Sequence, residues 1–109
     1  MTPTLYPIAY KQARMMGAGL FTLFHAWDIG DGFALEYWRG TDNNGACLRT
    51  LHDGHMVSVT HYATPGAAIR VLRIGGYPIP GLPAMTDEER EAGLLLHKRQ
   101  LRGHHVTTA

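Results

Sequence analysis

The chain of 109 residues contains one cysteine, Cys47, and no long run of apolar residues. A single cysteine cannot form a disulfide within the chain or build a cysteine-based zinc finger, so a reducing cytoplasm is the expected compartment. The most apolar stretch, residues 17–27, is interrupted by Thr22 and His25 and is too short to cross a bilayer. We therefore expect a cytoplasmic protein with no membrane segment and no targeting signal.

The chain also has little net charge. Ten lysines and arginines stand against nine acidic residues, which gives +1 with the seven histidines neutral. This balance provides no strong long-range attraction to nucleic acid or to an acidic membrane surface. The length and the 45% share of hydrophobic residues are typical of one globular domain, residues 1–109.

Signatures of catalysis are missing as well. Glu36 has no second carboxylate in a sequence pattern that would place it for acid–base chemistry. Ser58 lacks the sharp turn between glycines that exposes a nucleophile, and Gly75-Gly76 has no neighbouring lysine or serine for a phosphate. The sequence therefore predicts a protein that is not an enzyme and that needs no cofactor.

Residues 19–62 contain three turn signals that separate four runs of alternating hydrophobicity. The turns lie at residues 30–32, at residues 41–45 and at Asp53-Gly54, the last being the dipeptide favoured in type I′ hairpins. Such a pattern predicts an antiparallel meander of four strands. Together with the helices expected on either side, it predicts an α+β fold.

The loop lengths predict which side chains share a face of this sheet, because side chains alternate along a strand. A two-residue loop at Asp53-Gly54 places His52 opposite His55, with Thr50, Leu48 and Ala46 opposite Val57, Val59 and His61. A loop with an even number of residues within 41–45 and a three-residue loop at 30–32 place further apolar side chains on the same face. His25 is then expected to point inward beside Tyr37. The predicted core face comprises Phe21, Leu23, Trp27, Phe33, Leu35, Tyr37, Leu48, Val57 and Val59. The predicted opposite face comprises Ala34, Glu36, Trp38, Cys47, Arg49, Leu51, Met56, Ser58, Thr60 and Tyr62.

The segments around the meander are less uniform. Residues 8–16 are expected to form a short helix before the first strand, and the alternative is one helix over residues 7–27. Thr64-Pro65 is typical of a helix start, so residues 67–74 are expected to be helical, with a fifth strand as the alternative. The meander and this short helix together span residues 17–76.

The last part of the chain begins with an extended connector. Three prolines lie within residues 77–83 and exclude helix and central strand there, so residues 77–85 form a stiff proline-rich connector. Thr86 and Glu89 then form a capping box, which predicts a helix over residues 86–103. Its apolar stripe, with Leu94, Leu95 and Leu101, suits docking on the domain or on a second copy, and we expect a homodimer.

Two histidines suggest a weak metal-binding alternative. His52 and His55 are expected to face each other across the hairpin, and imidazole is a common ligand of transition metals. A tight turn directs Asp53 away from both rings, and His61 lies six residues farther along the strand. Polar residues at a hairpin tip are the simpler interpretation, so no metal is expected.

In the order of its elements, the stretch from Phe33 to Gly75 resembles the DNA-binding domains of the integrase-arm and plant ethylene-response type. Three strands are followed by a helix that begins at Thr64-Pro65. The resemblance implies that basic and aromatic side chains on an exposed sheet face read the major groove. Here that face offers Trp38 and Arg49, together with Glu36, which repels phosphate. DNA binding is therefore the second hypothesis.

Binding to a protein partner is the first hypothesis. Aromatic residues and arginine are the types that anchor interfaces, and the predicted partner-binding residues are Trp38, Arg49, Tyr62, Tyr77 and Glu36. The alternative is that the N-terminal or C-terminal helix covers Trp38 in a second small core. A small, arginine-rich chain without catalytic motifs is similar in kind to accessory proteins of phages or mobile elements. Such proteins inhibit host complexes, including defence complexes in the case of anti-CRISPR proteins.

Overall fold

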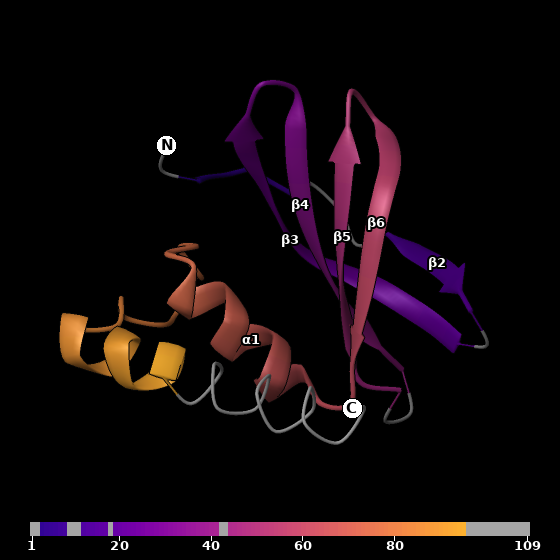
Figure 1. Cartoon of the computed structure of the whole chain (residues 1–109). Coiled ribbons are helices and arrows are strands. Elements are labelled where there is room, and N and C mark those ends of the chain that lie inside the picture. Colours follow the sequence, from indigo (N-terminus) through magenta and orange to yellow (C-terminus); the bar gives the residue numbers. More distant parts are fainter. Residues whose placement is uncertain (1–2, 9–11, 18, 42–43, 96–109) are drawn as a thin grey trace, which may run out of the picture.

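The computed structural model describes residues 3–8, 12–17, 19–41 and 44–95. These residues have an α+β fold, as predicted, in which an antiparallel sheet of six strands packs against helices (Figure 1). The strands are β1 (Thr4–Leu5), β2 (Ala13–Met16), β3 (Gly19–Gly30), β4 (Phe33–Gly40), β5 (Ala46–His52) and β6 (His55–Tyr62), and the helix α1 is Pro65–Ile74. Residues 87–95 form a further helical segment near the C-terminus.

The four strands β3 to β6 form the predicted meander, and β1 and β2 are additional. Both short strands pair with the side of β3 that faces away from β4, one near each end of this long strand. The expected helix over residues 8–16 is wrong where the structure describes it, since residues 13–16 form β2, and β3 excludes the alternative helix over residues 7–27. Residues 9–11 and 18 lie outside the described residues. Residues 13–16 turn back at Gly17 and pair with residues 19–22, because the edge of β3 offers backbone groups that a strand satisfies.

A tight turn joins the two strands of each of two hairpins, β3–β4 and β5–β6. Asp31-Gly32 and Asp53-Gly54 both have positive φ at each residue, which is the geometry of type I′ turns. The first turn has two residues instead of the expected three, and a register shift between Asp28 and Gly30 compensates for the difference. Trp27 consequently pairs with Leu35, and both lie on one face, as predicted.

Two further register shifts change the faces of the sheet. One lies between Leu23 and His25, so Phe21 and Leu23 occupy the face opposite to Trp27. The other makes Val57 an extra residue of β6, so Thr50 pairs with Ser58 instead of Val57. The predicted placements of these side chains are therefore wrong, because one extra residue in a strand reverses the alternation beyond it.

The bulge at Val57 also determines on which face of the sheet the later side chains of β6 lie. Ser58, Thr60 and Tyr62 share the face of Leu48, while Val59 and His61 share the opposite face with Cys47. The first group had been expected on the opposite face, and Val59 had been expected in the core. The register between β4 and β5 is uninterrupted, with Arg39 opposite Ala46. The connection is longer than predicted, but its residue number is even, so the faces agree with the prediction.

Helix α1 covers one face of the sheet, which we call the helix face. Its buried residues Ala68 and Leu72 pack in a core with Trp27, Tyr37 and Leu48. The Thr64 hydroxyl accepts a hydrogen bond from the Ala67 amide (3.2 Å), so the predicted helix start is confirmed and the alternative strand is excluded.

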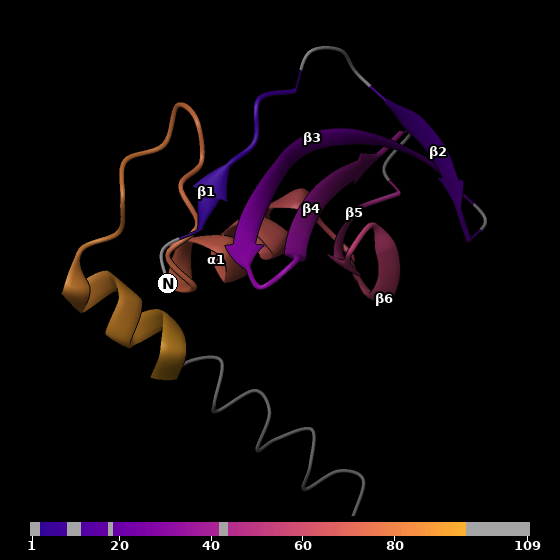
Figure 2. The same cartoon turned by 90° about the horizontal axis from the view of Figure 1, so that it is seen from above.

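The other face, which we call the bent face, is covered by the sheet itself. Figure 2 shows β3 as an arc that runs from β1 at one end to β2 at the other. Phe21 and Leu23 from the curved half pack with Trp38 and Cys47 in a second core, and Met16 of β2 packs against them. The Phe21 ring lies 5.9 Å from the His61 ring of β6, so the cover reaches across the sheet at this end.

The helical segment near the C-terminus begins with the predicted capping box. The Thr86 hydroxyl accepts from the Glu89 amide and the Glu89 carboxylate accepts from the Thr86 amide, each at 3.1 Å. These hydrogen bonds lower the pKa of Glu89. The remainder of the predicted helix, including Leu101, lies outside the described residues. Within the described ranges, no helix has the length and apolar character needed to cross a membrane.

Candidate functional site

Three of the predicted partner-binding residues meet on the bent face. The indole Nε1 of Trp38 donates to Glu36 Oε1 (2.9 Å), and Arg49 Nε lies 3.1 Å from the same oxygen. The Arg49 guanidinium also lies over the Trp38 ring, 5.7 Å from its centroid. Neighbouring strands bring the three together, because Glu36 pairs with Arg49 in the register of β4 and β5.

This group is an internal network and not an exposed face. Trp38 is only 2% exposed, and the side chains of Arg49 and Glu36 are 9% and 18% exposed. The expected exposure of Trp38 is wrong, and the alternative of a second small core is correct, with a strand in place of the expected helix as its cover. The network supports the surface beside it, since the carboxylate neutralises the arginine and orients the indole.

The burial of Trp38 and Arg49 also bears on DNA binding. Sheet-reading domains need several basic and aromatic side chains that protrude from the exposed face. Here the arginine is held by Glu36 and the tryptophan is covered, so these two residues do not provide that surface.

The exposed part of the bent face lies along β6. Met56, Val57 and Val59 are 56%, 57% and 37% exposed, and we call these three side chains and the outer backbone of β6 the apolar edge. β6 is the last strand in the sheet order, so within the described ranges its outer backbone groups have no neighbouring strand. No lysine, arginine, aspartate or glutamate occurs between His55 and Tyr62.

A shallow groove lies next to the apolar edge. Its volume is about 420 Å³, and its lining includes the small residues Ala26 and Ala34, with Leu51 and Glu36 beside them. Tyr6, from the segment after β1, forms part of the wall. The groove exists because two alanines stand where larger side chains would fill the surface, and because the curved half of β3 covers the other end of this face.

Tyr62 and Tyr77 lie elsewhere. Tyr62 is half-buried against the core of the helix face, and Tyr77 packs edge-on against Trp27 with the ring centroids 5.3 Å apart. Burial raises the pKa of both phenols above the usual value. The five predicted residues are therefore divided between the buried network, the margin of β6 and the proline-rich connector. Their binding roles stay predictions.

His52 and His55 pair across the turn, as predicted. The His52 ring stacks on Phe33 with centroids 4.3 Å apart, and its Nε2 lies 3.6 Å from the Asp53 carboxylate. Asp53 is therefore closer to this imidazole than the sequence suggested. Among the residues that the structure describes, no three metal-ligating side chains form a cluster.

Cys47 is buried beside Met16, with their sulfur atoms 4.0 Å apart. Burial raises the pKa of this thiol to about 11, although the charge of Arg49 opposes the shift. The thiolate is the nucleophilic form of cysteine, so this residue is suited to packing and not to covalent chemistry.

Comparisons of the chain with protein-family models, with curated proteins and with solved structures find no match. Sequence reasoning missed the apolar edge because it assigned Val57 and Val59 to the core, and no residue in this stretch signals a bulge.

Proposed function

We propose that the protein is a non-catalytic protein-binding protein that accepts an extended segment of a partner along the apolar edge. The observation that carries the proposal is the exposure of β6, an eight-residue strand at the margin of the sheet. A strand in this position presents a row of backbone donors and acceptors, and a partner segment that adds to it satisfies them.

The side chains of β6 indicate the chemistry of the partner segment. Met56, which pairs with Leu51, and Val59, which pairs with Arg49, lie exposed on the bent face, so alternate residues of an added strand would contact their apolar side chains. β6 carries no formal charge with its histidines neutral. The favoured partner segment is therefore extended and apolar on one side, and it is not selected by charge.

The outer margin of β6 also lacks the features that keep sheet margins from pairing. Natural proteins protect such strands with lysine, proline or inward charges. β6 contains none of these residues, and its single bulge lies near the turn, which leaves residues 58–62 in regular pairing with β5. At the opposite margin, β2 carries Arg14 and has only four residues.

Inhibition of a host complex by a phage or mobile-element protein is the biological setting that we propose for this binding. A small protein that covers a strand margin of its target blocks assembly or access without catalysis. The support is the combination of small size, balanced charge and an unprotected strand.

The test uses the full chain as bait in a lysate of its native host, with mass spectrometry and hydrogen exchange as readouts. Wild type should retain a partner, and the bound form should protect β6 amides that exchange freely in the unbound protein. Val59→Lys places a charge on the apolar edge and should abolish retention. Met15→Lys, at an exposed position of β2, is the matched control and should retain the partner.

Three outcomes contradict the proposal. Retention by Val59→Lys at wild-type level would exclude the apolar edge. Protection of β6 amides in the protein alone, dependent on concentration, would show that a second copy occupies the strand. Binding to DNA that weakens steeply with salt would favour the nucleic-acid hypothesis instead.

A further inference from the structure

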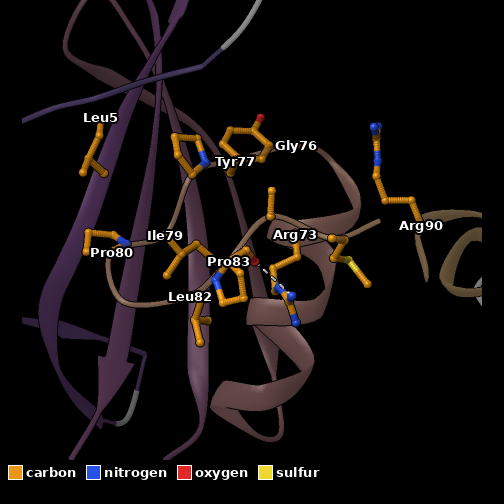
Figure 3. A pocket seen from close by; sticks show the side chains of 12 residues that line it. Leu5, Arg73, Gly76, Tyr77, Ile79, Pro80, Leu82, Pro83 and Arg90 are labelled. Carbon is orange, nitrogen blue, oxygen red and sulfur yellow. Dashed lines mark hydrogen bonds between the residues drawn. The ribbon is translucent and has the colours of Figure 1, made fainter. Parts of the chain in front are cut away.

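A second concave site lies beside β1, at the end of the strand order opposite to β6. There the connector folds back on itself (Figure 3). Its volume is about 490 Å³, within the range of pockets that bind small molecules. The end of α1, the connector and the start of the C-terminal helical segment enclose it, and Leu5 of β1 completes the wall. Ile79, Leu82 and Met85 contribute apolar surface.

The walls of this connector pocket are fixed by hydrogen bonds at both ends. The Trp27 indole Nε1 donates to the Pro78 carbonyl (2.8 Å), and Arg73 Nη2 donates to the Pro83 carbonyl (3.1 Å). Between them, the Leu82 amide donates to the Ile79 carbonyl (3.1 Å) across a turn in which Gly81 has φ of 84°. Proline rings lock φ along the same segment, so the pocket is formed before any ligand arrives.

The charge of the pocket is of one sign. Arg73 and Arg90 line it, and none of the described lining residues is acidic. Arg73 Nε is buried without a hydrogen-bond partner, although its Nη2 binds Pro83. Glu89 lines a neighbouring hollow together with Arg73. Hydrogen bonds with Thr86 lower the pKa of Glu89 and the charge of Arg73 adds to the shift, so this carboxylate offsets part of the charge of Arg73.

We propose that the connector pocket binds a small aliphatic carboxylic acid. The chain of the ligand packs on Ile79 and Leu82, and its carboxylate lies at Arg73, since a guanidinium matches the planar geometry of a carboxylate. Figure 3 shows the Arg90 side chain directed away from Arg73, so Arg90 contributes the attraction of its charge. This inference does not depend on the proposed partner binding, because the pocket shares none of its lining residues with β6.

The first experiment is an NMR titration of the full chain with octanoate and, separately, with octan-1-ol. Octanoate should shift the amide signals of residues 77–85 and the indole N–H signal of Trp27, which reports on the Pro78 carbonyl. The alcohol has the same chain without the charge and should bind about fivefold more weakly. Equal affinity for the two probes would overturn the charge argument.

A pair of matched variants locates the site. Leu82→Asp introduces a negative charge into the pocket at a residue that is 45% exposed, and it should remove octanoate binding. Leu20→Asp makes the same change at a residue that is 40% exposed on β3 and should bind like wild type. Equal binding by both variants, or shifts confined to β6, would overturn the proposal.

The arginines are tested in the same way. Arg90→Ala should weaken octanoate binding about threefold, the loss expected for one exposed charge, and Arg14→Ala on β2 should not. The amide spectrum of each variant shows whether the fold is kept. If Arg90→Ala keeps the fold and binds octanoate as wild type does, the assignment of the carboxylate to this end of the pocket is wrong.

Discussion

The two faces of the sheet are closed by different means. On the helix face, α1 and Ile79 of the connector pack over Trp27, Tyr37 and Leu48. On the bent face, the curved half of β3 and Met16 of β2 cover Trp38 and Cys47, and this cover ends before it reaches the tip of the β5–β6 hairpin.

A helix laid across a sheet covers the strands that it crosses, whereas a bent sheet covers only the part toward which it curves. The difference explains why the apolar edge stays open although it adjoins a well-packed core. It also accounts for the position of the largely buried ion pair of Glu36 and Arg49, which lies at the boundary between the covered and the open half of the bent face.

The largest expected effect concerns the closed face. Leu72→Ala removes a side chain of α1 that is fully buried and should lower the free energy of unfolding by about 3 kcal/mol, through lost burial and the cavity left behind. Urea denaturation followed by circular dichroism measures the change. Val59→Ala on the open face should cost less than about 1 kcal/mol. Similar losses for both variants would show that the two faces are equally closed.

The second prediction concerns the boundary between the halves of the bent face. Glu36→Ala leaves the Arg49 guanidinium buried without its carboxylate and should cost about 2 kcal/mol, less than a fully buried pair because Glu36 is partly exposed. The double variant Glu36→Leu with Arg49→Met should recover most of this loss. Urea denaturation of the three proteins provides the comparison. An unaffected Glu36→Ala variant would mean that solvent reaches the guanidinium.

The third prediction concerns the turn at the open end. Gly54 has φ of 84° and an added side chain would meet open space, so Gly54→Val tests the backbone conformation alone. A β-branched residue tolerates positive φ poorly, and the variant should lose about 1 kcal/mol or more. Gly54→Asn should lose less, because asparagine adopts this region more readily. Melting temperatures of the two variants rank them, and equal values would contradict the turn geometry.

The smallest expected effect is a pH dependence of the melting temperature that arises from His25 on the helix face. His25 stacks on Tyr37 with ring centroids 6.0 Å apart, and burial lowers its pKa from 6.5. The unfolded chain therefore binds a proton at a higher pH than the folded chain does. This contribution to stability is present above the unfolded pKa and is lost as pH falls from there through the lower folded pKa. His25→Phe should reduce the decrease in melting temperature between about pH 7.5 and about pH 5.5. An identical decrease in both proteins would contradict the assignment.

Several parts of the fold were predictable because their signals are local. Asp53-Gly54 predicts the tight turn, Thr64-Pro65 predicts the start of α1, and Thr86 with Glu89 predicts the capping box. In each case a short-range hydrogen bond or a backbone preference decides the structure, and the residues that decide it are neighbours in the chain.

The site was less predictable because it depends on register. Counting residues from the turns assigned Phe21 and Val59 to the core face, and each was displaced by one extra residue in its strand. Bulges arise from the way a whole sheet twists and closes, and Phe24 and Val57 carry no local mark of them. The N-terminal strand β2 was missed for a similar reason, since its partner edge exists only after β3 has folded.

The bulge at Val57 divides β6 into two parts that pair with β5 in different registers. Before the bulge, β6 pairs with β5 in the register set by the Asp53-Gly54 turn, and after the bulge this register is advanced by one residue. If Val57 paired with Thr50 and no residue bulged, Val59 and His61 would lie on the side of α1, with Thr60 and Tyr62 on the other side. Deletion of Val57 would keep the present faces, because Met56 and Ser58 already pair with Leu51 and Thr50. The extra residue thus decides which side chains β6 presents to each side of the sheet.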